Sequence, residues 1–204
     1  MSKIALSGDA SGTGTFTIAS PNSNSNFTLT LPAATGTVLT SATTTGFPAG
    51  SVLQVQNVYH TSASQLTSSG ALHELTTSLR IAFTPVSASS TIYLQCFGSF
   101  VSPQSDNLQY AAFYDVTNSA YVNLPPASGS RSRVHWFNRT KSFDVNDAGF
   151  MNFNISVANT NTTARTYTVY HGTEGSVIQF LASTLSTASG ATYPLVFTVT
   201  EVAA

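Results

Sequence analysis

Charged residues are scarce in this chain of 204 residues, at 7%, with seven Lys and Arg against eight Asp and Glu. The basic residues form no run, so the chain lacks the electrostatic footprint of a protein that binds a phosphate backbone, and we expect no nucleic-acid partner. A monomer of this size normally keeps itself soluble with many more charges. The surface of hydroxyls and amides therefore indicates that partner chains cover much of it.

Long apolar runs are also missing. No stretch approaches the roughly 20 residues that span a bilayer, and residues 1–6 lack the apolar run of a signal peptide. We expect a protein made in a cytoplasm and not inserted into a membrane. Cys96 is the single cysteine, so no intrachain disulfide forms, and stability outside a cell would come from packing and assembly.

Catalytic and cofactor motifs are absent as well. The scarce acidic residues do not form an obvious carboxylate pair of the kind that cuts polysaccharide, and no GxSxG elbow or phosphate loop occurs. The four histidines show no HxH or HExxH spacing for zinc, although one His from each chain of a trimer could meet on a three-fold axis. Asp144, Asn146 and Asp147 are typical of a turn, with a weak calcium loop as the alternative. We expect no enzyme activity, no cofactor and no resident metal.

Short alternating runs rich in Thr, Val, Phe and Tyr recur between Ser, Asn, Gly and Pro clusters, which predicts an all-β chain. The division is an N-terminal module over residues 1–50 and an antiparallel β-sandwich head of jelly-roll type over residues 51–204. Strands are predicted at residues 15–19, 26–31, 52–59, 75–83, 91–101, 108–115, 133–138, 150–157, 165–171, 176–181 and 193–202. In three of these strands one face is apolar: Ile92, Leu94 and Cys96; Met151, Phe153 and Ile155; Leu195, Phe197 and Val199.

Two further features follow from the pattern. Residues 151–157 and 167–169 are predicted to pair as a hairpin across the polar loop 159–163. The two short strands before residue 50 carry too few large residues to form a core alone. They need partners, which identical chains wound about a three-fold axis would supply.

Several segments resemble structural proteins of tailed bacteriophages, of the cyanophage and marine phage type. Residues 14–22 (GTFTIASPN) and 28–39 (TLTLPAATGTVL) are similar to a recurring segment of their fibre-like proteins. Residues 48–55 (PAGSVLQV), 83–92 (FTPVSASSTI) and the ending 193–204 are similar to the entry, a strand pair and the closing strand of the head. The resemblance implies a virion-associated, homotrimeric fibre or host-binding protein whose N-terminal module binds other virion proteins. Residues 106–149 depart from that pattern.

One segment combines charge with aromatic surface. Residues 130–141 (SRSRVHWFNRTK) hold four of the seven basic residues and the only Trp. Sugar recognition uses an aromatic face and side chains that hydrogen-bond hydroxyls, so the candidate receptor or glycan contacts are Arg131, Arg133, Trp136 and Arg139. The alternative buries Val134 and Trp136 in the core or at a subunit interface. Tyr110, Tyr114 and Tyr121 have the same two interpretations.

The sequence therefore predicts a virion structural protein, a tail fibre or similar appendage that attaches to the host, with surface polysaccharide as a candidate partner. A capsid decoration, head-fibre or tail-joint protein with a purely structural role is the alternative. A polysaccharide depolymerase is the third hypothesis, and it would need carboxylates converging in a cleft.

Overall fold

The computed structural model describes residues 11–15, 17–19, 21–28, 30, 33, 35, 47–61, 64–66, 71–101, 107–129, 133–140, 148–173, 178–180 and 194–204. The chain divides into two units, Met1–Val38 and Leu39–Ala204. In the described part of the first unit the backbone forms bends and a turn but no strand. The interwound N-terminal module stays a prediction about the assembly, since strands so short need a neighbouring chain to pair with. None of the described helices is long and apolar enough to cross a membrane.

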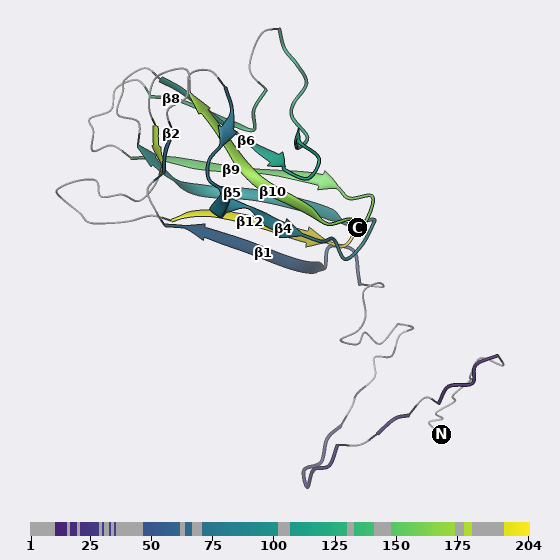
Figure 1. Cartoon of the computed structure of the whole chain (residues 1–204). Helices are drawn as coiled ribbons and strands as arrows, with labels where there is room; N and C mark the ends of the chain where they lie inside the picture. The colour runs from purple at the N-terminus through teal and green to yellow at the C-terminus, as the bar shows by residue number, and fades with distance from the viewer. Residues whose placement is uncertain are drawn as a thin grey trace. The chain divides into compact units, whose positions relative to one another are not determined.

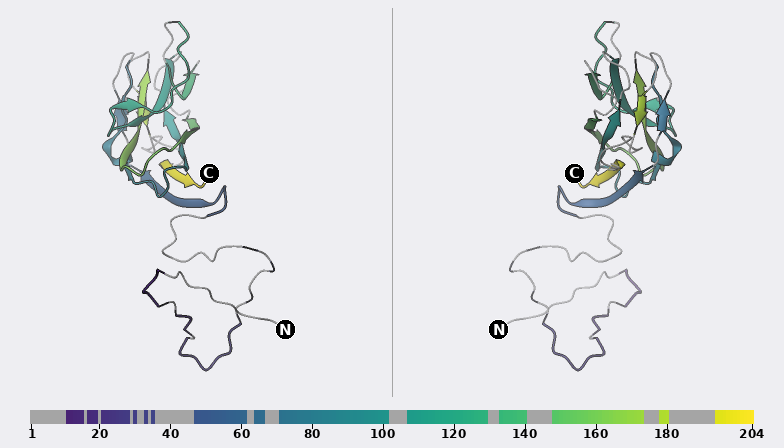
Figure 2. Two further views of the ribbon diagram at one scale, coloured as in Figure 1. Left: turned by 90° about the vertical axis from the view of Figure 1, so that its right-hand side faces the viewer. Right: turned by 90° about the vertical axis from the view of Figure 1, so that its left-hand side faces the viewer.

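The second unit is a sandwich of two antiparallel sheets (Figures 1 and 2). The first sheet places side by side β1 (Val52–His60), β12 (Leu195–Val202), β5 (Thr91–Val101) and β9 (Ala148–Ala158). The short strand β11 (Ile178–Phe180) pairs with the last two residues of β5, and β2 (Ser64–Leu66) pairs with β11.

The second sheet is built around the pair β10 (Arg165–Thr173) and β6 (Asn107–Asp115). The strands β3 (His73–Glu74) and β4 (Ile81–Phe83) flank β10, and β7 (Ala120–Tyr121) and β8 (Trp136–Thr140) flank β6. The pair β3 and β4 can be counted as one strand position, and so can the pair β7 and β8. With the eight long positions numbered in chain order, the order across the first sheet is 1-8-3-6 (β1, β12, β5, β9) and across the second sheet 2-7-4-5 (β3/β4, β10, β6, β7/β8). This is the strand order of a jelly roll, which confirms the predicted all-β sandwich.

The core lies between the two sheets and is built by alternation along each strand. Ile92, Leu94 and Cys96 face inward from β5 and are fully buried. Phe113, from β6 in the second sheet, lies with its ring centroid 4.5 Å from that of Phe153 and 5.6 Å from that of Phe197, both in the first sheet. Burial of each such side chain contributes about 2 kcal/mol, so these contacts hold the two sheets together.

The predicted hairpin between residues 151–157 and 167–169 is wrong. β9 pairs with β5 along its whole length, whereas β10 pairs with β6 in the other sheet. The alternation identified the inward faces correctly, because Met151 and Val169 are both fully buried. Two strands with one apolar face each can lie side by side in one sheet or face each other from opposite sheets. Alternation within each strand is the same in both arrangements and does not distinguish them.

The predicted strand 75–83 is interrupted. Thr76 ends the extended backbone, and its hydroxyl accepts a hydrogen bond from the backbone N–H of Ser78 at 3.3 Å. A 3-10 turn, η1 (Thr77–Leu79), follows and buries Leu79 completely. A side-chain oxygen that bonds a nearby backbone N–H offers the chain an alternative to the sheet ladder, so β3 and β4 become separate short strands.

Candidate functional site

Three tyrosines gather on the outer face of the second sheet. Tyr114 of β6 lies opposite Tyr121 of β7, and Tyr170 lies opposite Ala112, two residues further back along β6. The rings of Tyr114 and Tyr170 stack with centroids 4.2 Å apart, and Tyr121 meets both edge-on, at 5.0 and 5.7 Å. All three side chains are partly exposed, so the cluster presents aromatic surface to solvent.

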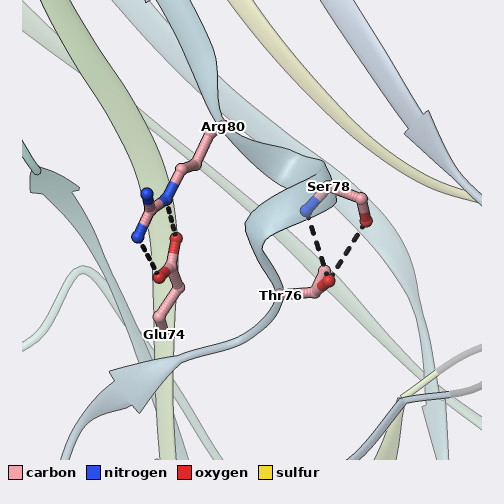
Figure 3. Close-up of polar contacts among 4 residues, drawn as sticks. All are labelled: Glu74, Thr76, Ser78 and Arg80. Atoms are coloured by element: carbon pink, nitrogen blue, oxygen red, sulfur yellow. Dashed lines mark hydrogen bonds and ion pairs between the residues drawn. The ribbon is translucent and has the colours of Figure 1, made fainter.

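An ion pair borders this cluster. Glu74 of β3 lies directly opposite Tyr170 of β10. The guanidinium of Arg80 donates two hydrogen bonds to the Glu74 carboxylate, each of 2.7 Å (Figure 3). The 3-10 turn positions Arg80, because Arg80 is its C-terminal cap and turns the chain back toward Glu74. We call Tyr114, Tyr121, Tyr170, Glu74 and Arg80 the tyrosine patch.

The protonation states in the tyrosine patch are set by these neighbours. Hydrogen bonds from Arg80 lower the pKa of the Glu74 carboxyl. Burial raises the pKa of the Tyr121 and Tyr170 phenols, and the neighbouring tyrosines raise it further. At neutral pH Tyr121 and Tyr170 therefore offer neutral hydroxyls that donate and accept, Glu74 offers a carboxylate that accepts, and Arg80 offers a guanidinium that donates.

This combination suits a sugar. An aromatic ring face packs against the apolar face of a pyranose, and the groups around it hydrogen-bond the hydroxyls. The bidentate geometry holds Glu74 and Arg80 in fixed positions, so the polar groups are ordered before a ligand arrives.

The sequence-predicted residues are distributed differently. Of the three candidate tyrosines, Tyr114 and Tyr121 contact each other in the tyrosine patch, but Tyr110 is only 3% exposed and is not available to a surface ligand. Trp136 packs against the hydrophobic core, in agreement with the structural interpretation of this residue. Arg133 donates hydrogen bonds to the carbonyl oxygens of Pro125 at 2.6 Å and Leu124 at 3.3 Å, and thus holds the loop before β8.

Other predicted residues do not enter the site. Arg131 lies outside the described residues, as do Asp144, Asn146 and Asp147, and for Arg139 only the backbone, in β8 opposite Leu108, is described. Which residues contact a ligand stays a prediction.

Three members of the tyrosine patch, Tyr170, Glu74 and Arg80, were not predicted from the sequence. Tyr170 carried a usable signal, because it alternates with the inward-facing Tyr167, Val169 and His171 and so points outward. Glu74 and Arg80 carried none. They meet because a 3-10 turn and the pairing of β3 with β10 bring them beside a strand about 90 residues later in the sequence.

The histidines form no metal centre in the part of the chain that the structure describes, where no three His, Cys, Asp or Glu side chains cluster. His171 is fully buried, and burial lowers its pKa to about 3. His135 accepts a hydrogen bond from the backbone N–H of Phe113 at 3.0 Å through Nδ1, and burial lowers its pKa as well. These two imidazoles are neutral parts of the fold.

Comparison with known proteins gives structural matches only. No family profile matches the sequence, and no curated protein matches it. Among solved structures, the Gt strain of infectious bursal disease virus matches at 12% identity and a TM-score of 0.40, over 85% of this chain and 43% of that chain. The Gx strain matches at 12% identity and 0.36, over 74% and 37%. T=1 particles derived from the same virus match at 9% identity and 0.39, over 74% and 40%.

This chain thus spans less than half of each matched viral chain. With TM-scores below 0.5 the correspondence is partial, and the fold assignment rests on strand order and register. The function is therefore argued from the chain itself.

Proposed function

We propose that this chain is a non-enzymatic virion structural protein, a homotrimeric tail fibre or similar appendage of a tailed phage, that attaches to surface polysaccharide of the host through the tyrosine patch. The resemblance of residues 14–39 to fibre-like phage proteins supports the virion assignment. The jelly-roll head suits it, because this fold recurs in viral capsid and lectin domains. The observation that carries the attachment role is the stacked pair Tyr114–Tyr170 beside the ordered Glu74–Arg80 pair.

Attachment works by avidity in this proposal. A shallow patch with three rings and one ion pair binds a sugar weakly. Three patches on one trimer, and several trimers on one particle, turn later binding events into intramolecular ones and raise the overall affinity by about 10² to 10⁴.

The test is to remove the aromatic platform from the full-length chain. Tyr170→Ala removes one partner of the stacked pair, and we expect at least about a tenfold loss of binding to purified host surface polysaccharide, because a ring contact is worth about 0.5–1.5 kcal/mol in each of three sites. Phe137→Ala is the matched control, since Phe137 is 71% exposed on β8 of the same sheet and has no contact with the patch rings among the described aromatic pairs. Equal binding by both variants, with the assembly intact, would contradict the attachment role.

A capsid decoration, head-fibre or tail-joint role is the second candidate. It is favoured by the outer face of the first sheet, whose described side chains include several exposed apolar ones and no charged one and therefore suit contact with other proteins. Labelling the chain on intact particles and imaging them would separate the two roles. A label along the tail fibres supports the appendage, and a label over the capsid surface supports decoration.

A further inference from the structure

Among the side chains that the structure describes, the outer face of the first sheet, formed by β1, β12, β5 and β9, carries no charged group. Strand alternation and register place the following described side chains on it, together with the buried Ser99 of β5, which lies opposite Phe150. They are Val52, Val55, Asn57 and Tyr59 of β1; Val196, Thr198, Thr200 and Val202 of β12; Thr91, Tyr93, Gln95 and Phe97 of β5; and Phe150, Asn152, Asn154, Ser156 and Ala158 of β9. We call this surface the charge-free face.

Apolar and polar side chains form rows across the charge-free face. Tyr59, Val196 and Phe97 lie side by side on three adjacent strands. Asn152 of β9 completes this row. The next row is polar, with Asn57, Thr198, Gln95 and Asn154, and the row after it mixes Val55 and Tyr93 with Thr200 and Ser156. The ring of Phe150 stacks on that of Phe97, with centroids 6.4 Å apart and planes 13° from parallel.

The large apolar side chains on the charge-free face are about half exposed. The exposed fractions are 59% for Val52, 53% for Val55, 61% for Tyr59, 45% for Tyr93, 46% for Phe97 and 57% for Phe150. Four strands about 4.8 Å apart and eight residues long at about 3.3 Å each make a surface of roughly 500 Å². The exposed apolar side chains share that surface with polar ones, and exposed apolar side chains gathered on one face mark interaction sites.

The area allows contact between copies of the same surface. Around a three-fold axis each face is divided between two neighbours, so three such faces bury about 1,500 Å² in total, and the predicted contacts of the N-terminal module add to this. The absence of charge indicates what the partner is like, because a face with no charged group has nothing to pair with the charges of a polyanion or a charged protein surface.

The polar row fits self-association as well. Asn57, Gln95 and Asn154 end in amides, which donate and accept hydrogen bonds, so identical faces can satisfy one another. The tyrosine patch, by contrast, contains Glu74 and Arg80 and lies on the outer face of the other sheet.

We infer that the charge-free face is the surface through which copies of this chain pack against one another around the axis of the homotrimer. The inference rests on the trimer proposed above and adds the residues that form its contact. The three tyrosine patches then face outward, each free to bind a ligand.

The first experiment measures protection of the charge-free face in the full-length protein. Gln95→Cys places a thiol in the polar row, and Thr162→Cys places one in the exposed loop between β9 and β10. The native Cys96 is fully buried, and burial raises its thiol pKa, so it does not react with maleimide in the folded chain. We expect the thiol from Gln95→Cys to be labelled at least about tenfold more slowly than that from Thr162→Cys.

The second experiment introduces charge. Phe97→Lys places the same charge in every copy at the contact, and light scattering coupled to size-exclusion chromatography should give a lower mass. If another part of the chain keeps the copies together, Gln95→Cys in the Phe97→Lys background should instead lose its protection. Phe137→Lys, on the other sheet, should keep the mass of the natural chain. Gln95→Lys exchanges one exposed polar side chain for another and repeats the test if Phe97→Lys does not fold.

Equal labelling rates for the thiols from Gln95→Cys and Thr162→Cys in an oligomer would overturn the inference and leave the trimer in place. A natural chain with the mass of one copy would overturn both the inference and the trimer. Polysaccharide binding by the tyrosine patch is measured separately, so failure of the attachment role is distinguishable from either outcome.

Discussion

At the scale of single residues, the carboxylate of Glu201 accepts hydrogen bonds from four groups, although no sequence pattern marks this residue. Its carboxylate is fully buried and accepts hydrogen bonds from the backbone N–H groups of Val86 and Ser87 at 2.8 and 2.9 Å. It also accepts from the hydroxyl of Ser90 at 2.6 Å and the amide of Gln54 at 2.7 Å. One side chain on β12 therefore fixes the loop between β4 and β5 and the start of β1.

Glu201→Gln should destabilise the fold by about 3 kcal/mol at pH 7, because the amide loses the charge that strengthens these bonds and turns an NH₂ group toward donors. Urea unfolding followed by tyrosine and tryptophan fluorescence measures the change. Glu74→Gln is the control, since its partly exposed ion pair should contribute less than about 1 kcal/mol. Equal effects of the two substitutions would contradict the anchoring role of Glu201.

The contribution of Glu201 also depends on pH. Burial alone would raise its pKa, but the four hydrogen bonds outweigh burial and lower the folded-state pKa below the ordinary 4.5. The stabilisation is therefore fully present above pH 4.5 and is lost as the pH falls through the lower folded-state pKa. The difference in unfolding free energy between the natural chain and Glu201→Gln should shrink as the unfolding experiment moves from pH 7 to pH 3, and a constant difference would contradict this linkage.

At the scale of elements, the crossing from β9 to β10 determines the topology. Asn159, directly after β9, is almost fully buried. Its backbone N–H donates to the carbonyl of Ser90 at 2.8 Å, and its side-chain amide donates to the carbonyl of Ser87 at 2.5 Å. These bonds hold the end of β9 beside the start of β5 while the chain leaves for the other sheet.

Asn159→Ala should lower the unfolding free energy by about 1–2 kcal/mol, because the carbonyl of Ser87 loses its donor. Thr160→Ala, in the adjacent exposed position, is the control and should change the unfolding free energy by less than about 0.5 kcal/mol. Urea unfolding midpoints at pH 7 compare the two variants. If Thr160→Ala lowers the unfolding free energy as much as Asn159→Ala does, the hydrogen bonds of Asn159 are not the cause of the loss.

At the scale of the whole molecule, the head carries its own core. Every buried apolar side chain of the core cluster lies between Leu75 and Val199. The ends of the head are tied together, because the N–H of Gly50 donates to the carbonyl of Ala203 at 2.9 Å and the N–H of Ala203 donates to that of Ser51 at 2.8 Å.

A chain that begins at Phe47 should therefore keep the fold of the head. We expect its β-type circular dichroism and a single thermal transition within a few degrees of that of the full-length chain, since no core residue is removed. Calorimetry of both chains measures this. A loss of the transition would show that residues 1–46 stabilise the head.

Strand content could be predicted from the sequence because alternation is a local property. Each run such as 91–101 or 195–202 shows which side chains avoid water, and the structure buries Leu94, Phe197 and their inward neighbours as predicted. The sequence did not predict that the strand is interrupted at Thr76. The side-chain hydrogen bond that interrupts it involves a single Thr, whereas alternation is repeated over a whole strand and is easier to recognise.

Only the tertiary structure decided which strands pair and which surface residues meet. The sequence determined that β9 and β10 each turn an apolar face inward, but their placement in opposite sheets follows from the pairing of β9 with β5 and of β10 with β6. The tyrosine patch and the charge-free face arose in the same way, because the register between distant strands sets which side chains lie side by side. The sequence around an apolar side chain determines whether that side chain faces the core. Which side chains lie next to one another on the surface depends on the register between strands, and therefore on the whole fold.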